Sequence, residues 1–261
     1  MAIHRVAADG FGSAAEAYEA ARPGYPAEAV DWVMANLAID PAAILVDLAA
    51  GTGKLTRLLA ERGARPMAVE PVAGMRALLH RTAPDIPVVA GVAEALPLRT
   101  GAVDAMTIAQ AFHWFDNPAT HAELGRVLRP GGRIGLLWNA RDRTVDWVDA
   151  VWSIMDRVEK HAPWRDHDQT RSSAAWRIPG FSRFDAARFF HEQVASPPMV
   201  VQRLASVSHV AVLPEVERRA VLDEVRQILD HHPDTTGRAE LSIRYRVECF
   251  VAERLPGGRS S

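Results

Sequence analysis

The chain has 261 residues, 48% of them hydrophobic, which is enough material for one large domain with its own core. Its formal net charge of −2 gives no overall basic character that would indicate a nucleic-acid or membrane partner. The single cysteine, Cys249, excludes an intrachain disulfide and fits a reducing compartment. No apolar run could cross a bilayer, and no signal-peptide pattern is present. We expect one cytoplasmic domain over residues 1–261, of unknown oligomeric state.

The N-terminal part of the chain predicts two helices. Residues 11–21 are rich in alanine, and the sequence Arg-Pro-Gly-Tyr-Pro at 22–26 ends this first helix. The second helix begins at Pro26 and continues to about residue 37, because an apolar stripe recurs at helical spacing.

Residues 44–54 form the pattern around which the rest of the sequence can be interpreted. An apolar run at 44–48 predicts a strand buried on both faces, and Gly51 and Gly53 follow it directly. An amphipathic helix then continues to Gly63, which is a favourable C-terminal cap. A strand, a glycine turn and a helix bring backbone N–H groups close to a ligand.

Spacing separates the ligands that such a turn binds. A phosphate-binding P-loop requires glycine where Leu48 stands and Ser or Thr where Leu55 stands. A dinucleotide-binding turn requires a third glycine where Thr56 stands. The stretch Asp-Leu-Ala-Ala-Gly-Thr-Gly at 47–53 instead resembles the first motif of class I S-adenosylmethionine (SAM)-dependent methyltransferases. The resemblance implies SAM as cofactor, held by the motif residues Asp47, Ala49, Gly51, Thr52 and Gly53.

The next unit supplies an acid at the end of a strand. Residues 66–69 predict a second strand ending in Glu70, and 71–80 predict a helix. Ligands of doubly wound sheets bind beyond the carboxyl ends of the strands, where Glu70 can accept hydrogen bonds from both hydroxyls of an adenosine ribose. The resemblance places Pro71 beside the cofactor and Met75 on the adenine face, although Met75 could equally be a core methionine.

The third strand, at 87–90, precedes the sequence Gly-Val-Ala-Glu-Ala-Leu-Pro-Leu at 91–98. This stretch resembles the family segment that holds the adenine edge, which implies contacts from Ala93 and Glu94. Val92 stands where the family commonly has an acid. The adenine contact therefore has less support from the sequence than the ribose contact of Glu70.

The fourth strand, at 103–108, leads into the sequence Ala-Gln-Ala-Phe-His-Trp-Phe at 109–115. A helix capped by Asn117 and Pro118 extends to about residue 129, and Pro-Gly-Gly at 130–132 turns into strand five at 133–138. By position after strand four, Gln110 and Ala111 are candidate cofactor contacts. His113 is a candidate general base, if the acceptor must lose a proton.

A substrate pocket is expected from aromatic residues and from the N-terminal segment. Phe112 and Trp114 are candidate pocket walls. The segment with Tyr18, Arg22 and Tyr25 resembles the family's entry segment, which folds over the cofactor and walls the pocket. The resemblance and the charge of Arg22 make Tyr18 and Arg22 candidate cofactor contacts and Tyr25 a candidate substrate contact.

Alternating strands and helices predict a doubly wound, mostly parallel, seven-stranded α/β sheet with right-handed crossovers. Its core is about 40–140 plus strands near 184–194 and 241–254. A helix at 145–161, the N-terminal cap at 11–37 and a helical insertion at 197–235 surround it. The resemblance covers about residues 12–140, and its nearest likeness is to trans-aconitate and ubiquinone-type methyltransferases.

These features predict a SAM-dependent methyltransferase acting on a small organic acceptor. A SAM-binding sensor or inactive subunit would need the same motif but no acceptor pocket, and a dinucleotide oxidoreductase is disfavoured at Thr56. The histidines lack metal-ligand spacing, so no metal is expected. The absence of a Gly-x-Ser-x-Gly elbow disfavours a serine hydrolase.

Overall fold

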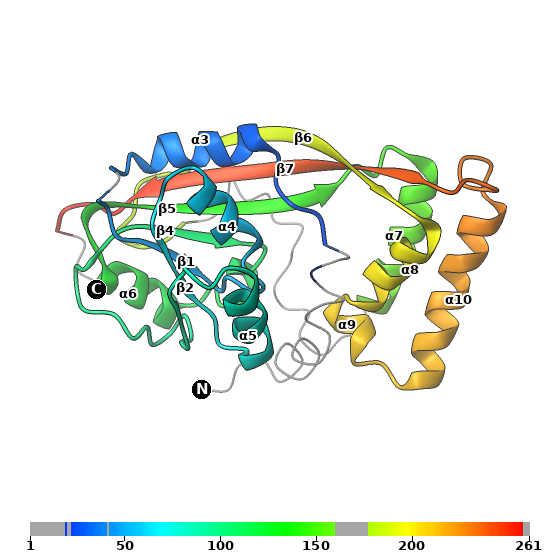
Figure 1. The fold of residues 1–261 in the computed structure, drawn as a ribbon, viewed down its shortest axis with the longest axis horizontal. Coiled ribbons are helices and arrows are strands. Elements are labelled where there is room, and N and C mark those ends of the chain that lie inside the picture. The colour runs from blue at the N-terminus through cyan, green and yellow to red at the C-terminus, as the bar shows by residue number, and fades with distance from the viewer. Residues whose placement is uncertain (1–18, 20–21, 41, 160–176, 258–261) are drawn as a thin grey trace. The chain divides into compact units, whose positions relative to one another are not determined.

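A computed structural model describes residues 19, 22–40, 42–159 and 177–257 (Figure 1). Tyr18 and nearly all of the predicted helix at 11–21 lie outside the described residues. The helices are α3 (Ala27–Leu37), α4 (Lys54–Glu61), α5 (Ala73–Thr82), α6 (Pro118–Val127), α7 (Asp146–Glu159), α8 (Pro197–Ala205), α9 (Ser208–Ala211) and α10 (Glu215–His231), with a 3-10 turn η1 (Phe112–Trp114). The strands are β1 (Leu45–Leu48), β2 (Pro66–Val69), β3 (Val88–Val89), β4 (Val103–Ala109), β5 (Leu128–Arg141), β6 (Asp185–Ala195) and β7 (Leu241–Glu253).

The strands form one seven-stranded sheet in the order β3-β2-β1-β4-β5-β7-β6. Strands β1 to β5 pair in parallel and β7 is antiparallel, which confirms the predicted mostly parallel α/β fold. The order reverses at β1, because Leu48 pairs with Val69 of β2 on one side and with Ile108 of β4 on the other. The carboxyl ends of β1, β2 and β4 therefore meet at one edge of the sheet, the usual ligand position in such folds.

The chain divides into two compact units, and the prediction of a single domain stays a prediction. The core unit consists of residues 24–139, 169–189 and 247–261, as far as they are described. The helical unit consists of residues 1–23, 140–168 and 190–246, again as far as described.

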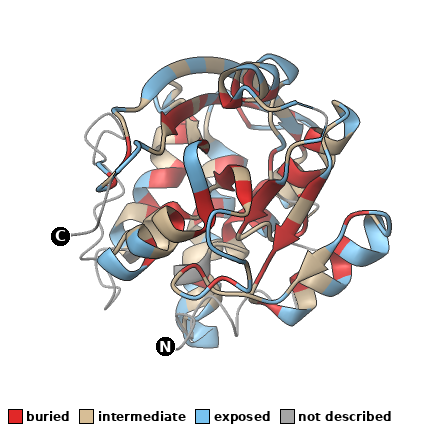
Figure 2. Ribbon diagram, turned by 90° about the vertical axis from the view of Figure 1, so that its left-hand side faces the viewer, coloured by how far each residue is buried: buried red, intermediate tan, exposed pale blue. Residues whose placement is uncertain are grey.

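In the core unit, neighbouring strand residues face opposite sides of the sheet. Leu45 and Ala105 pack with α3 and α4, whereas Val46 and Met106 pack with α6. Figure 2 shows the result, with buried strands in red and outward helix surfaces in pale blue. Burial on both faces explains why every residue of β1 except Asp47 is apolar.

Cys249 lies in the part of this core where β7 meets α3. Its side chain is fully buried, and its Sγ atom lies 4.0 Å from the carbonyl oxygen of Ala29. Burial raises the pKa of the Cys249 thiol to about 12.

The helical unit has a core of its own, formed by α7, α8, α10 and residues of β7. Trp147, Trp152 and Tyr245 are its buried aromatic residues. No helix in the described part of the chain combines the length and the apolar character that a membrane crossing requires.

One predicted turn is wrong. Residues 130–132 belong to β5, which begins at Leu128 instead of at residue 133. The register shifts between Val103 and Ala105 of β4, so the glycines form an irregular stretch of strand. A Cβ atom on Gly132 would lie 2.9 Å from two backbone carbonyl oxygens, of Arg129 and Asp104, and this close approach explains the glycine.

Candidate functional site

The turn after β1 contains three residues with positive φ. They are Ala49 (φ 56°), Gly51 (φ 59°) and Gly53 (φ 85°). The two glycines adopt this conformation at little cost, whereas alanine is strained there. Their surroundings also differ, because a Cβ atom on Gly53 would lie 2.8 Å from Leu79 Cγ, and one on Gly51 would meet only Met75 Sδ, at 3.7 Å, among the described residues. Gly53 is thus required for packing of the turn on α5, whereas Gly51 lies at an open position beside Met75.

Glu70, directly after β2, links the glycine turn to the start of α5. One carboxylate oxygen accepts a hydrogen bond from the Gly51 amide at 2.9 Å, and the other accepts one from the Val72 amide at 2.8 Å. The side chain is only 4% exposed, and burial raises its pKa, an effect that these two hydrogen bonds and the charge of Arg76 partly oppose. Two oxygens offer about four acceptor positions, so acceptor capacity remains for a ligand at the turn.

Asp47 lies on β1, two residues before the turn begins, and its carboxylate links β1 to the helix that follows the turn and to the neighbouring strand β4. Its carboxylate accepts hydrogen bonds from the hydroxyls of Thr56 on α4, at 2.5 Å, and Thr107 on β4, at 2.7 Å. Asp47 is 1% exposed, and burial raises its pKa to about 6, against the lowering effect of the two hydroxyls. The Asp47 carboxylate therefore contacts the protein itself and positions the turn from within the sheet.

A second strained residue lies at the same edge of the sheet. Gln110, directly after β4, has a φ of 57°, and its amide donates a hydrogen bond to the carbonyl of Leu137. Among the described non-glycine residues, positive φ occurs at Ala38, Ala49 and Gln110. Two of these three residues follow the paired strands β1 and β4, where the sheet order reverses. Strained backbone of this kind concentrates at ligand sites.

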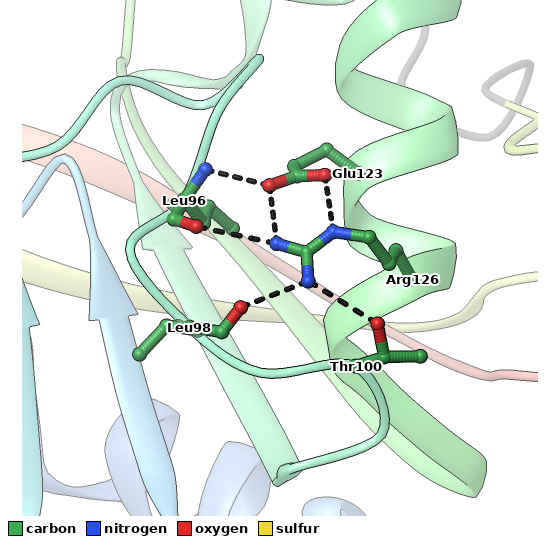
Figure 3. Close-up of polar contacts among 5 residues, drawn as sticks. All are labelled: Leu96, Leu98, Thr100, Glu123 and Arg126. Carbon is green, nitrogen blue, oxygen red and sulfur yellow. Dashed lines mark hydrogen bonds and ion pairs between the residues drawn. The ribbon is translucent and has the colours of Figure 1, made fainter.

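The segment at 91–98 is held by an ion pair that sequence reasoning missed (Figure 3). Glu123 and Arg126 on α6 bind each other through contacts of 2.6 and 2.7 Å. Glu123 also accepts from the Leu96 amide, and Arg126 donates to the carbonyls of Leu96 and Leu98. The hydrogen bonds from Arg126 lower the pKa of Glu123. Because an acid and a base three residues apart are ordinary on a helix surface, nothing in the sequence distinguished this pair.

The same segment turns tightly at the predicted adenine contacts. The Ala95 amide donates to the carbonyl of Val92, which brings Ala93 and Glu94 to the tip of the turn. Ala93 is 5% exposed and Glu94 is half-buried. Asn117 donates to Glu94 over 3.4 Å.

The aromatic residues after β4 lie in different environments. Phe112 is fully buried in the core unit and contacts Phe115 edge-on and His121 face-on. His113 and Trp114 are half-buried and in contact, with ring centroids 5.1 Å apart. The structure thus gives Phe112 a packing position and leaves His113 and Trp114 with surface that a ligand could reach.

The remaining predicted site residues are distributed between the two units. All four of the next predicted residues belong to the core unit: Thr52 is buried, and the half-buried ones are Tyr25, Pro71 and Ala111. The carbonyl of Pro71 accepts from Arg76 at 2.6 Å. Arg22 belongs to the helical unit, where its guanidinium lies 3.4 Å from the carbonyl of Ser206. No group of three or more potential metal ligands occurs among the described residues.

Known proteins resemble this chain over most of its length. Residues 46–136 match the methyltransferase domain family. An uncharacterized methyltransferase of Mycobacterium tuberculosis (strain ATCC 25618 / H37Rv) is 38% identical over 244 residues, 93% of this chain and 94% of that protein. An uncharacterized methyltransferase-like protein of Schizosaccharomyces pombe is 34% identical over 246 residues, 92% and 93% of the two chains. A solved structure from Anaeromyxobacter dehalogenans, proposed to be a type II methyltransferase, has a TM-score of 0.68 at 23% identity and covers 90% of this chain and 99% of its own.

The chain therefore belongs to the class I SAM-dependent methyltransferases. Within that class it resembles, over more than nine-tenths of its length, the methyltransferases of M. tuberculosis and S. pombe, whose substrates are not established.

SAM is the cofactor of this family, and the geometry of the turn fits it. The open position beside Gly51 allows close approach to the backbone, and the Glu70 carboxylate lies at the same place with acceptor capacity for ribose hydroxyls.

Proposed function

We propose that this methyltransferase transfers a methyl group to a small organic acceptor, with SAM bound between the glycine turn and Glu70. The observation that carries the proposal is the direct hydrogen bond from the Gly51 amide to the Glu70 carboxylate, which joins the two predicted cofactor contacts. The strained backbone of Ala49 and Gln110 at the same edge supports a ligand site there.

SAM supplies a methyl group on a positively charged sulfur that is already a good leaving group. The chain has mainly to bind, orient and exclude water. Glu70 would accept from the ribose hydroxyls, and Ala93, Glu94 and Met75 would surround the adenine. His113 and Trp114 would face the acceptor, because they retain accessible surface after β4.

The contact of His113 with Trp138 sets a condition on any role as a base. The indole N–H of Trp138 donates to Nδ1 of His113 over 3.5 Å. A neutral ring that accepts at Nδ1 carries its proton on Nε2, where it can donate a hydrogen bond but cannot accept a proton. A role of His113 as a general base at Nδ1 would therefore require release of the contact with Trp138.

The test combines cofactor binding with turnover. Calorimetry should show SAM binding to the wild type, and labelled SAM with a metabolite extract should give a labelled small molecule. Glu70→Gln keeps the shape of the side chain but removes its charge and one acceptor, so SAM affinity should fall about tenfold or more. Glu61→Gln, at an exposed position on α4, is the matched control and should bind SAM normally.

Each result bears on a separate part of the proposal. Unchanged affinity in Glu70→Gln would remove Glu70 from the cofactor site. SAM binding without labelled product in any extract would favour a binding protein without turnover.

A further inference from the structure

One arginine of α5 holds the backbone between β2 and α5. The terminal nitrogen Nη1 of Arg76 donates to the carbonyl of Glu70 at 2.8 Å and to the carbonyl of Pro71 at 2.6 Å. Both carbonyls lie between the last residue of β2 and Val72, the N-cap of α5, which makes no capping hydrogen bond with its side chain. Arg76 therefore fixes the chain at the point where it leaves the sheet and enters the helix.

These contacts hold Glu70 from both ends. Its carbonyl accepts from Arg76, and its two carboxylate oxygens accept from the amides of Gly51 and Val72. Arg76 uses carbonyl oxygens in both of its hydrogen bonds here, so it leaves the remaining acceptor positions of the carboxylate to a ligand. A direct ion pair with an arginine would have occupied those positions. The arrangement thus directs the Glu70 carboxylate to the glycine turn and keeps acceptor capacity there.

Arg76 also acts on the charge of Glu70. Burial raises the pKa of the Glu70 carboxyl, whereas its two amide hydrogen bonds and the charge of Arg76 lower it. The charge of Asp47, on β1, raises this pKa further. Among the described residues, Arg76 and Asp47 are the charged side chains that act on the Glu70 carboxyl, and they act in opposite directions. Arg76 is thus the side chain whose positive charge favours the ionised form of Glu70.

We propose that Arg76 is a positioning residue of the cofactor site, which holds the backbone after β2 so that the Glu70 carboxylate faces the glycine turn and binds the ribose hydroxyls of SAM. The inference rests on the proposed cofactor contact of Glu70, and it adds a residue that acts through Glu70. The ionised carboxylate binds the hydroxyls more strongly, because a protonated carboxyl has lost its charge and part of its acceptor capacity. Removal of Arg76 should therefore change both the strength of SAM binding and its dependence on pH.

The affinity for SAM should fall as the pH drops through the pKa of Glu70, because the ionised form binds more tightly. Without the charge of Arg76 this pKa is higher. In Arg76→Met the loss of affinity should therefore have its midpoint at a higher pH than in the wild type. Arg76→Lys keeps the charge, so its midpoint should lie near that of the wild type.

The test is calorimetry with SAM on the full-length protein, at pH values from 5 to 8. At pH 7.5, Arg76→Met should bind SAM about tenfold more weakly, because the backbone around Glu70 loses two hydrogen bonds from a charged donor. Arg81→Met, at an exposed position on the same helix, removes the same charge and should match the wild type in affinity and midpoint. Arg76→Gln, which keeps a donor and loses the charge, makes the same comparison if Arg76→Met does not fold.

A double variant separates this role from a merely structural one. In Glu70→Gln no carboxylate titrates at this position, so adding Arg76→Met should leave the pH dependence of SAM binding as it is in Glu70→Gln alone. The Asp47 carboxylate titrates in all of these proteins, and the Glu70→Gln background shows its share.

The proposal is overturned if the midpoint in a folded Arg76→Met or Arg76→Gln is that of the wild type, or if Arg76→Met moves the midpoint equally in the Glu70→Gln background. Normal SAM affinity in Glu70→Gln would contradict the proposed cofactor contact, and the role of Arg76 with it. Weak binding in Glu70→Gln together with an unmoved midpoint in the Arg76 variants would contradict the role of Arg76 alone.

Discussion

The buried carboxylate of Asp47 should make the protein less stable as the pH rises. Burial raises the pKa of Asp47 from 3.8 to about 6 in the folded chain. Between these two values the folded protein keeps a proton that the unfolded chain releases, so a rise in pH favours unfolding. The contribution of Asp47 is fully present below pH 3.8 and is lost as the pH rises through about 6.

The magnitude follows from the same two values. A pKa difference of one unit is worth ~1.4 kcal/mol, so the difference between 3.8 and about 6 corresponds to a loss of roughly 3 kcal/mol by pH 7. Asp47→Asn has nearly the same shape and no proton to lose. Its free energy of unfolding relative to the wild type should therefore rise by up to about 3 kcal/mol between pH 4 and pH 7.

The assay is urea unfolding followed by tryptophan fluorescence, for wild type and variant, at several pH values from 4 to 7.5. Comparing the two proteins at each pH removes the contribution of titrating groups that do not interact with Asp47; Glu70, whose pKa the charge of Asp47 raises, is the exception. Asp85→Asn, at an exposed position, is the control for loss of one acidic side chain. A difference that stays constant with pH, or a wild type that gains stability over Asp47→Asn as the pH rises, would refute this account of the buried carboxylate.

Three further predictions concern the turn and its supports. Gly51→Ala should fold, at a cost of about 1 kcal/mol for its positive φ, and should lose most SAM affinity in calorimetry; normal affinity would contradict close approach of the cofactor to this residue. Gly53→Ala should be the less stable of the two in thermal unfolding, because its Cβ would lie 2.8 Å from Leu79 Cγ; equal melting temperatures would show that α5 adapts. Arg126→Met should cost about 1–3 kcal/mol in urea unfolding and weaken SAM binding through the 91–98 segment, whereas loss of stability with unchanged affinity would confine Arg126 to a structural role.

Most of the core unit could be predicted from the sequence because its signals are local. The apolar run of β1, the Asn117 cap of α6 and the glycines of the turn each determine structure within a few residues. Reliance on local signals also explains the error at 130–132, because the sequence Pro-Gly-Gly is typical of a turn. Gly131 donates there to the carbonyl of Arg254, a residue more than a hundred positions away, and this pairing extends β5.

The candidate site was predictable where a residue follows a strand, and not where side chains meet across the fold. The positions of Glu70 and Gln110 directly after β2 and β4 could be predicted, whereas their contacts with the cofactor stay predictions. The hydrogen bonds of Asp47 with Thr107, and those of Arg126 with the 91–98 segment, depend on tertiary packing that no spacing reveals. Arg22 was assigned to the cofactor from a family resemblance, and that assignment stays a prediction.

The buried Cys249 gives this protein an internal reporter. A thiol that is fully buried and protonated at neutral pH reacts with maleimides or disulfide reagents only after β7 separates from α3. The rate of modification in native buffer therefore measures how often this part of the sheet opens. Because the chain has no other cysteine, one introduced at an exposed position would carry a fluorophore alone, without prior removal of the native thiol.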